Sequence, residues 1–296
     1  MENTWECLIA NESVFEGISK DQPESDIELL QQRIKSQGTA VTTSNGAPIR
    51  LTNTHCNLTY DPLRHRLIVC DVFRGLWTTN KDLIAKTINS SVEKISQGGA
   101  LLFQFDPEKR KWEPWKDVPF ASETAPLEYL PDRRVLWIRS GKSYLLDDSK
   151  NSELIDLKES GDGPGSGCLT AYDPESKMIV AVRGKNTYSY SITSNQWQLL
   201  HNGTGPYGVI PKSSFCYDSI SKKFILVTSE TTPCLWVFDL KKNEWSNPVT
   251  SGDIPVPGSF ICYFDPVHNV TVLYSGYIED KTRKWSIFVY RHTKLK

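Results

Sequence analysis

The sequence has little that would indicate a metal site, a disulfide framework or a membrane segment. Its seven cysteines are scattered, and none forms a Cys-x-x-Cys pair, so neither a zinc site nor a disulfide framework is expected. No stretch approaches the ~20 apolar residues that are needed to cross a bilayer. The N-terminus also lacks the basic start and apolar run of a signal peptide. We therefore expect a cytoplasmic protein with reduced thiols and no membrane contact.

The net charge is small, and known catalytic motifs are lacking. The formal net charge is −1, so no overall field attracts nucleic acid, and no nucleic-acid partner is expected. The P-loop, GxGxxG, GxSxG and HExxH signatures are absent. No two of the five histidines have the spacing of metal ligands. We expect no cofactor and no metal, and the sequence favours a non-catalytic protein while leaving enzymatic activity open.

What the sequence does contain is a repeated unit. Each unit begins with an apolar segment that ends in an aromatic-Asp pair, and a β-branched apolar run, a third run and a fourth segment follow. The markers are Tyr60-Asp61, Tyr172-Asp173, Tyr217-Asp218, Phe264-Asp265 and a degenerate member with Tyr129 and Asp132, and Trp112, Trp197 and Trp245 lead the fourth segment in three units. The last three spacings between the aspartates are 41, 45 and 47 residues, which is typical of four-stranded propeller blades. Because the aspartate recurs in every unit, we expect it to serve a turn and not catalysis.

The two ends of the chain complete one another in this pattern. The fifth unit stops after its third strand, and Trp5 lies in an Asn-x-Trp segment like those that begin the fourth strands. We predict one all-β domain, a β-propeller of about five four-stranded antiparallel blades that the N-terminal strand closes by pairing with the last blade. The predicted parts are residues 1–10 for the closing strand, 11–54 for a long, partly helical insertion between blades, 55–118 for blade 1 with an insertion at 77–99, 124–158 for blade 2, 166–200 for blade 3, 213–248 for blade 4 and 259–296 for blade 5.

The units resemble the repeats of kelch and galactose-oxidase-type propellers. The shared marks are the aromatic-Asp pair, the tryptophan of the fourth strand and a glycine after the second strand, at Gly75, Gly141, Gly184 and Gly276. The resemblance covers residues 55–296 and the first ten. It departs in having one glycine where the family has two, and in five blades where the family commonly has six or seven. The copper site of galactose oxidase is not expected, because the histidines are scattered.

The two insertions are predicted to lie on one face of the propeller, beside blade 1. Helical spacing relates Ile27, Leu30 and Ile34 in the first, and Leu83, Ile84, Ile88, Val92 and Ile95 in the second. One interpretation is that these helices only cover the propeller. The other is that they form a ridge that binds a protein or peptide partner, because long loops on a rigid scaffold often carry function.

Basic residues recur where the second strand of a blade ends. They are Arg74, Arg139, Lys142, Arg183 and Lys185. A guanidinium group matches the geometry of a carboxylate or phosphate, so these residues are candidates for binding a small anionic ligand. The alternative is that they are solvated or paired at the entries of loops.

A carbohydrate-directed protein is the second hypothesis. Trp77 and Tyr277 are candidates for stacking on a sugar, although either could cover the core, and Asp71 and Glu128 are unmatched acids in the repeat. The favoured interpretation of Glu128 is a buried carboxyl hydrogen-bonded to a neighbouring blade. The inner-strand thiols are expected to pack in the core, at Cys56, Cys168, Cys216 and Cys262. The sequence therefore favours an interaction scaffold with no catalytic residues, and a glycan-binding or glycoside-active propeller that uses the central mouth is the alternative.

Overall fold

The computed structural model describes residues 27–37, 40–44, 46–48, 58–71, 81–89, 101–118, 124–147, 153–165, 167–210, 212–229, 234–251, 255, 258–279 and 282–292. The chain divides into two compact units. The first comprises residues 1–123 and 148–154, and the second comprises residues 124–147 and 155–296.

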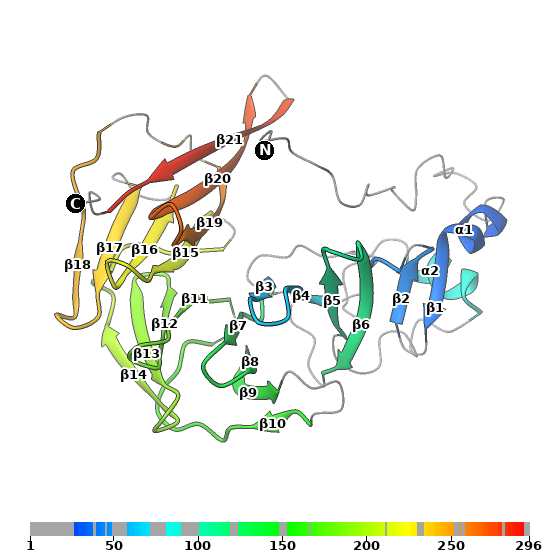
Figure 1. Cartoon of the computed structure of the whole chain (residues 1–296), viewed down its shortest axis with the longest axis horizontal. Helices are drawn as coiled ribbons and strands as arrows, with labels where there is room; N and C mark the ends of the chain where they lie inside the picture. The colour runs from blue at the N-terminus through cyan, green and yellow to red at the C-terminus, as the bar shows by residue number, and fades with distance from the viewer. Residues whose placement is uncertain are drawn as a thin grey trace. The chain divides into compact units, whose positions relative to one another are not determined.

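The fold is all-β and belongs to the β-propeller class, as the repeat predicts. The described residues contain five blade-like antiparallel sheets, in which each strand pairs with its neighbour in the sequence (Figure 1). Four of these sheets have four strands, and the last has three within the described residues. Short strands that pair in sequence order need only tight turns, which explains why Asp, Asn and Lys recur between them.

The first unit contains blade 1 and the described parts of both insertions. The blade consists of β3 (Leu58–Asp61), β4 (Arg66–Asp71), β5 (Leu101–Asp106) and β6 (Lys111–Asp117). The first insertion contributes α1 (Ile27–Arg33), β1 (Ile34–Gln37) and β2 (Ala40–Thr43), and the second contributes α2 (Lys81–Thr87). The expectation that Ile34 continues the first helix is wrong. Ile34 begins β1 and pairs with Thr43, because the β-branched residues of β2 offer it a strand partner.

The second unit contains blades 2 to 5. Blade 2 consists of β7 (Leu127–Leu130), β8 (Val135–Ser140), β9 (Lys142–Asp147) and β10 (Ile155–Asp156), and blade 3 consists of β11 (Leu169–Asp173), β12 (Met178–Arg183), β13 (Asn186–Ser191) and β14 (Gln196–His201). Blade 4 consists of β15 (Ser213–Asp218), β16 (Lys223–Thr228), β17 (Leu235–Asp239) and β18 (Glu244–Ser246). The described strands of blade 5 are β19 (Ser259–Asp265), β20 (Val270–Glu279) and β21 (Thr282–Tyr290). The first strand of each blade contacts the first strand of the next, from β7 to β11, β15 and β19.

The core of the second unit lies between successive blades. Trp137 of blade 2 packs with Tyr190 and Trp197 of blade 3 in one cluster. A second cluster joins Val180 of blade 3 to Phe224 of blade 4, and a third joins blade 4 to blade 5. Each sheet therefore buries its apolar faces against its neighbours, which is the packing mode of repeat proteins.

The recurrent aspartates cap the turns, as predicted. Asp61 Oδ1 accepts hydrogen bonds from the backbone N–H groups of Leu63 and Arg64, at 2.9 and 3.1 Å. Asp218 and Asp265 each accept two such bonds, and Asp173 accepts one. Four residues after the aspartate the backbone has a positive φ, at His65, Lys177, Lys222 and Asn269. The aspartate thus stabilises a turn that ends in the left-handed region.

Asp132 does not occupy the marker position of blade 2. Leu130 holds that place, because it pairs with Val135 as Asp61 pairs with Arg66. Asp132 lies two residues further into the turn and accepts a hydrogen bond of 2.7 Å from the Tyr172 hydroxyl of blade 3. It therefore links two blades and does not cap its own turn.

The tryptophans of the fourth strands pack as the repeat predicts. Trp112 lies opposite Phe105, Trp197 opposite Tyr190 and Trp245 opposite Phe238, with ring centroids 4.9 to 5.0 Å apart. The indole N–H groups of Trp197 and Trp245 reach back toward the preceding blade and donate at 2.9 Å to Glu159, in the connection that follows blade 2, and to Thr187 of blade 3. Each such ring therefore serves both its own sheet and the junction behind it.

Blade 5 differs from the others within the described residues. Tyr290 of β21 stands where the other blades place the aromatic partner of tryptophan, since it pairs with Thr271, the second residue of β20. The prediction that residues 1–10, with Trp5, supply a fourth strand concerns residues outside the described ones and stays a prediction. Gly276 is not a turn glycine, because it lies inside β20 opposite Trp285, and a Cβ there would overlap the indole ring.

Removing one turn aspartate should show how much the cap contributes. Asp218 is 1% exposed and accepts two backbone N–H groups at 2.9 Å. We expect Asp218→Ala to lower the free energy of unfolding by about 1–3 kcal/mol, because two amides lose their acceptor. Asp218→Asn keeps an oxygen at that place and should cost clearly less. Urea unfolding of both variants measures the difference, and equal losses would contradict the turn role.

Candidate functional site

The two insertion helices of the first unit contact each other through their apolar sides. Leu30 of α1 and Ile84 of α2 have no exposed surface, and Ala85 is 3% exposed. Their other sides are polar, with Glu28, Gln31 and Gln32 exposed on α1 and Asp82 and Lys86 exposed on α2. Both predicted helices are thus present at their central residues, and Val92 and Ile95 lie outside the described ones. The pair buries its apolar residues and leaves a polar surface.

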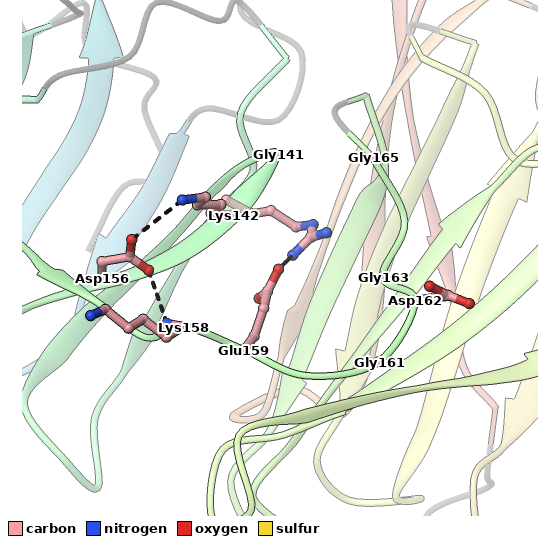
Figure 2. Close-up of a pocket in the computed structure, with 10 residues that line it drawn as sticks. Gly141, Lys142, Asp156, Lys158, Glu159, Gly161, Asp162, Gly163 and Gly165 are labelled. Carbon is pink, nitrogen blue, oxygen red and sulfur yellow. Dashed lines mark hydrogen bonds and ion pairs between the residues drawn. The ribbon is translucent and has the colours of Figure 1, made fainter.

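The second unit contains a cavity at the junction of blades 2 and 3. Its volume is about 570 Å³. It is lined by the adjoining ends of β8 and β9, by Asp156 at the end of β10 and by residues of the following segment 158–165 (Figure 2). Two of the predicted basic residues, Arg139 and Lys142, line it. The site therefore lies where a connection between blades crosses the end of a sheet.

Arg139 is the central side chain of this junction. It is the penultimate residue of β8 and is only 3% exposed. Its Nε donates to the carbonyl of Pro164 at 3.2 Å, and its Nη1 donates to Ser143 Oγ at 3.1 Å and forms an ion pair with Glu159. The guanidinium also lies over the Trp197 ring, 4.7 Å from its centroid, which adds a cation–π contact. The structure thus shows that Arg139 is paired at the entry of a loop, which was the alternative to anion binding in the sequence analysis.

Glu159 joins Arg139 to blade 3. One of its carboxylate oxygens pairs with Arg139 Nη1, and the other accepts the indole N–H of Trp197 at 2.9 Å. Because Glu159 is largely buried, with its side chain 11% exposed, removal of Arg139 would leave the Glu159 charge uncompensated in a poorly solvated place. Sequence reasoning missed Glu159, because nothing in the repeat pattern marks an acid after the fourth strand.

The glycine-rich segment that follows Glu159 is the second element that sequence reasoning missed. Residues 161–167 contain four glycines. A Cβ at Gly163 would lie 2.5 Å from Arg139 Nη2 and 2.9 Å from the Trp197 ring, and a Cβ at Gly165 would lie 2.5 Å from Arg183 Nη1. The segment can therefore run directly over these side chains only because it carries none of its own. The density of glycine was the signal available in the sequence.

Two lysines stand at the edge of the cavity. Lys142 Nζ lies 3.7 Å from Asp156 Oδ2, and its side chain is 67% exposed. Asp156 Oδ1 accepts the backbone N–H of Lys158 at 2.9 Å, and the Lys158 side chain is exposed. In Figure 2 the Asp162 carboxylate points away from this group. An exposed ion pair of this length contributes little to stability, so the ammonium group of Lys142 is available to a stronger partner.

Among the described residues, the other three predicted site residues do not line this cavity. Arg183 and Lys185 flank Gly184 at the end of β12 and are exposed. Tyr277 is half-buried in the β20–β21 hairpin, with its hydroxyl 3.4 Å from Ser286 Oγ. Arg74 and Trp77 lie outside the described residues. Of the predicted site residues that the structure describes, the cavity therefore unites Arg139 and Lys142 alone.

Glu128 has the role that was favoured from the sequence. It lies on β7, and its Oε1 accepts a hydrogen bond of 2.6 Å from Thr170 Oγ1 on β11, the first strand of blade 3. Burial raises the pKa of its carboxyl from 4.5 to about 7, although the bond from Thr170 opposes the shift. Asp71, the other unmatched acid of the repeat, lies in the other unit.

The described inner-strand cysteines are packed in the core, as expected. Cys168, Cys216 and Cys262 are buried and free of disulfides, whereas Cys56 lies outside the described residues. Burial raises the pKa of Cys168 to about 12, so the reactive thiolate is suppressed. Within the described ranges, no group of three potential ligands could hold a metal ion, and no helix is long and apolar enough to span a bilayer.

The raised pKa of Glu128 predicts a pH dependence. Because the folded state keeps this proton up to about pH 7 and the unfolded chain loses it near pH 4.5, the folded state binds more protons in between, and its stability falls as the pH rises through this window. Glu128→Gln keeps an acceptor for Thr170 and cannot ionise. We expect it to raise the free energy of unfolding by about 1–3 kcal/mol at pH 8, and by much less at pH 5. Urea unfolding at both pH values checks this, with the exposed Glu244→Gln as the matched control, which should follow the wild type.

Comparisons with known proteins identify no family for this chain. No protein-family model matches it, and no curated protein matches it in sequence. Among solved structures, TolB from Acinetobacter baumannii is similar with a TM-score of 0.42 and 13% sequence identity. The match covers 65% of this chain and 46% of TolB, so the chain matches less than half of the length of that protein. The assignment to the propeller class rests on the order and number of strands in the sheets.

Proposed function

We propose that this protein is a non-catalytic, cytoplasmic interaction scaffold of the kelch-like type. It binds a protein or peptide partner through the insertions beside blade 1. Propellers commonly serve as such scaffolds, because rigid sheets hold their connecting loops in fixed positions. The aromatic-Asp turns and the tryptophan-led fourth strands support the kelch-like assignment.

The packed pair of insertion helices carries this proposal. Leu30 and Ile84 are fully buried where α1 and α2 meet, so the described parts of the insertions form a packed element in the same unit as blade 1. A connection that only closed a turn would need two to six residues. The exposed side of this element carries acidic and amide groups at Glu28, Gln32 and Asp82, and one ammonium group at Lys86. The acidic and amide groups suit a partner with hydrogen-bond donors or basic residues at its contact surface.

The carbohydrate alternative has less support from the described residues. Tyr277 is half-buried and its hydroxyl lies near Ser286, so only part of its ring is exposed for stacking on a sugar. Glu128 is engaged with Thr170 between two blades. A glycosidase needs two carboxyl groups that face each other across a substrate, and no pair of this kind stands out among the described side chains.

A charge-reversed insertion surface tests the proposal. The variant Glu28→Arg, Gln32→Arg and Asp82→Arg changes three exposed side chains of α1 and α2. We expect it to lose the partners that the wild-type chain captures from cell extract, and to weaken binding of each partner, once purified, by at least about tenfold. Isothermal titration calorimetry with purified chain and partner measures the loss.

The matched control adds the same charge elsewhere. Glu108→Arg, Gln198→Arg and Glu244→Arg alter exposed residues of blades 1, 3 and 4, and this variant should keep both the partners and their affinities. Melting temperatures close to that of the wild type show that both variants are folded. If the insertion variant binds every partner as tightly as the control does, the proposed surface is wrong.

A further inference from the structure

The connection from blade 3 to blade 4 begins with an exposed Asn-Gly pair. Asn202 and Gly203 directly follow β14, and both are exposed. Gly203 has a φ of 69°, in the left-handed region, and a Cβ there would meet no atom within 4 Å. The turn therefore favours glycine at this position. Because glycine has no Cβ, the peptide nitrogen that follows Asn202 is sterically accessible.

One hydrogen bond restrains that peptide nitrogen. The N–H of Gly203 donates at 2.7 Å to Oδ1 of Asn186, the first residue of β13. The amide of Asn186 is itself oriented, because its Nδ2 donates to the Tyr188 hydroxyl at 3.2 Å. A hydrogen bond that a group donates while protonated opposes the loss of its proton. Asn186 thus holds the Gly203 nitrogen in its unreactive, protonated form.

The same connection is attached to the β12–β13 turn at two further points. The N–H of Gly205 donates to the carbonyl of Lys185 at 2.9 Å. Gly184 and Gly208 exchange two backbone hydrogen bonds, at 2.8 and 2.9 Å. None of these three bonds uses the side chain of Asn186. Removal of that side chain would therefore release the start of the connection and leave the rest attached.

We propose that Asn202 is a site of spontaneous deamidation whose rate is controlled by the hydrogen bond from Gly203 to Asn186. The Gly203 nitrogen loses its proton to solvent base and attacks Cγ of Asn202. A bond from this nitrogen to Cγ forms, the bond from Cγ to Nδ2 breaks, and Nδ2 takes up the proton and leaves as ammonia. Water then opens the cyclic imide at either carbonyl and leaves aspartate or isoaspartate. The net reaction consumes water, releases ammonia and needs no oxidant or cofactor.

The product differs from the original connection in charge and in chain length. A carboxylate replaces a neutral amide in an exposed segment between two blades. Isoaspartate also places an additional carbon atom in the main chain, so the original spacing between Gly203 and Asn186 is lost. The reaction therefore removes the contact that restrained it. The site is separate from the insertion surface, and neither proposal depends on the other.

Peptide mapping of the aged full-length chain tests the site. The purified chain is incubated in mildly alkaline buffer, and mass spectrometry measures the conversion of Asn202 to aspartate and isoaspartate. We expect slower conversion in the folded chain than in guanidinium chloride, because only local opening frees the Gly203 amide. Asn186→Ala should accelerate conversion in the folded chain by about three- to tenfold, which is the range that loss of one hydrogen bond permits.

Two matched variants separate this hydrogen bond from a general loosening of the connection. Asn186→Asp keeps an acceptor for the Gly203 N–H and should deamidate no faster than the wild type, because an ionised acceptor binds an amide at least as strongly. Thr204→Ala removes the contact of 3.4 Å between Thr204 Oγ1 and His201 Nδ1 and should keep the wild-type rate. Melting temperatures show that each variant is folded.

The other Asn-Gly pair of the sequence, at positions 45 and 46, is an internal reference in the same digest. Its rate should be the same in the wild type and in Asn186→Ala. The proposal is overturned if Asn202 does not deamidate in the unfolded chain, or if Asn186→Ala keeps the wild-type rate. It is also overturned if Asn186→Asp accelerates conversion as much as the alanine variant does.

Discussion

The packing of each blade on the next is the constraint on which the second unit depends. A sheet of four short strands has two apolar faces and cannot bury either of them alone. The largest fully buried side chains of this unit, which include Trp137, Tyr190, Phe224 and Phe238, belong to clusters with members from two consecutive blades. Hydrophobic burial is thus distributed over the junctions, so a single blade has no core of its own.

Hydrogen bonds between polar side chains cross the same junctions and fix how the blades are oriented. Thr170 and Tyr172 of blade 3 donate to Glu128 and Asp132 of blade 2, and Trp197 of blade 3 donates to Glu159 in the connection that follows blade 2. Trp245 of blade 4 donates to Thr187 of blade 3 in the same sense. Because a buried donor or acceptor without a partner costs more than the bond itself gains, these pairs set how one blade is placed against the next. They add specificity to contacts that apolar burial alone would leave adjustable.

The cavity follows from this arrangement. The chain must pass from the last strand of blade 2 to the first strand of blade 3, and on its way Ser160 pairs with Gln196 at the edge of β14. The glycines then let the segment lie over Arg139, Trp197 and Arg183. The chemistry of the site therefore comes from a connection and from the strand end that it covers, whereas the blades supply the rigid support. The insertion helices of the first unit repeat the principle, since they too are connections that have become ordered by burying Leu30 and Ile84.

The sequence by itself determined what depends on near neighbours. Alternating apolar runs, aspartates that bond amides two and three residues ahead, and tryptophans opposite an aromatic residue across a hairpin all act over a few residues, so they predicted the class, the blades and their turns. The same local reasoning misplaced Asp132, whose partner Tyr172 is 40 residues away. It also predicted that Gly276 follows the second strand, whereas Gly276 lies inside β20 and pairs with Trp285. Only the tertiary structure decided the ion pair of Arg139 with Glu159, the position of Glu128 beside Thr170 and the approach of the glycine-rich segment. These depend on which face of one blade meets the next, and residues 20 to 42 positions apart leave no periodic trace of that contact in the sequence.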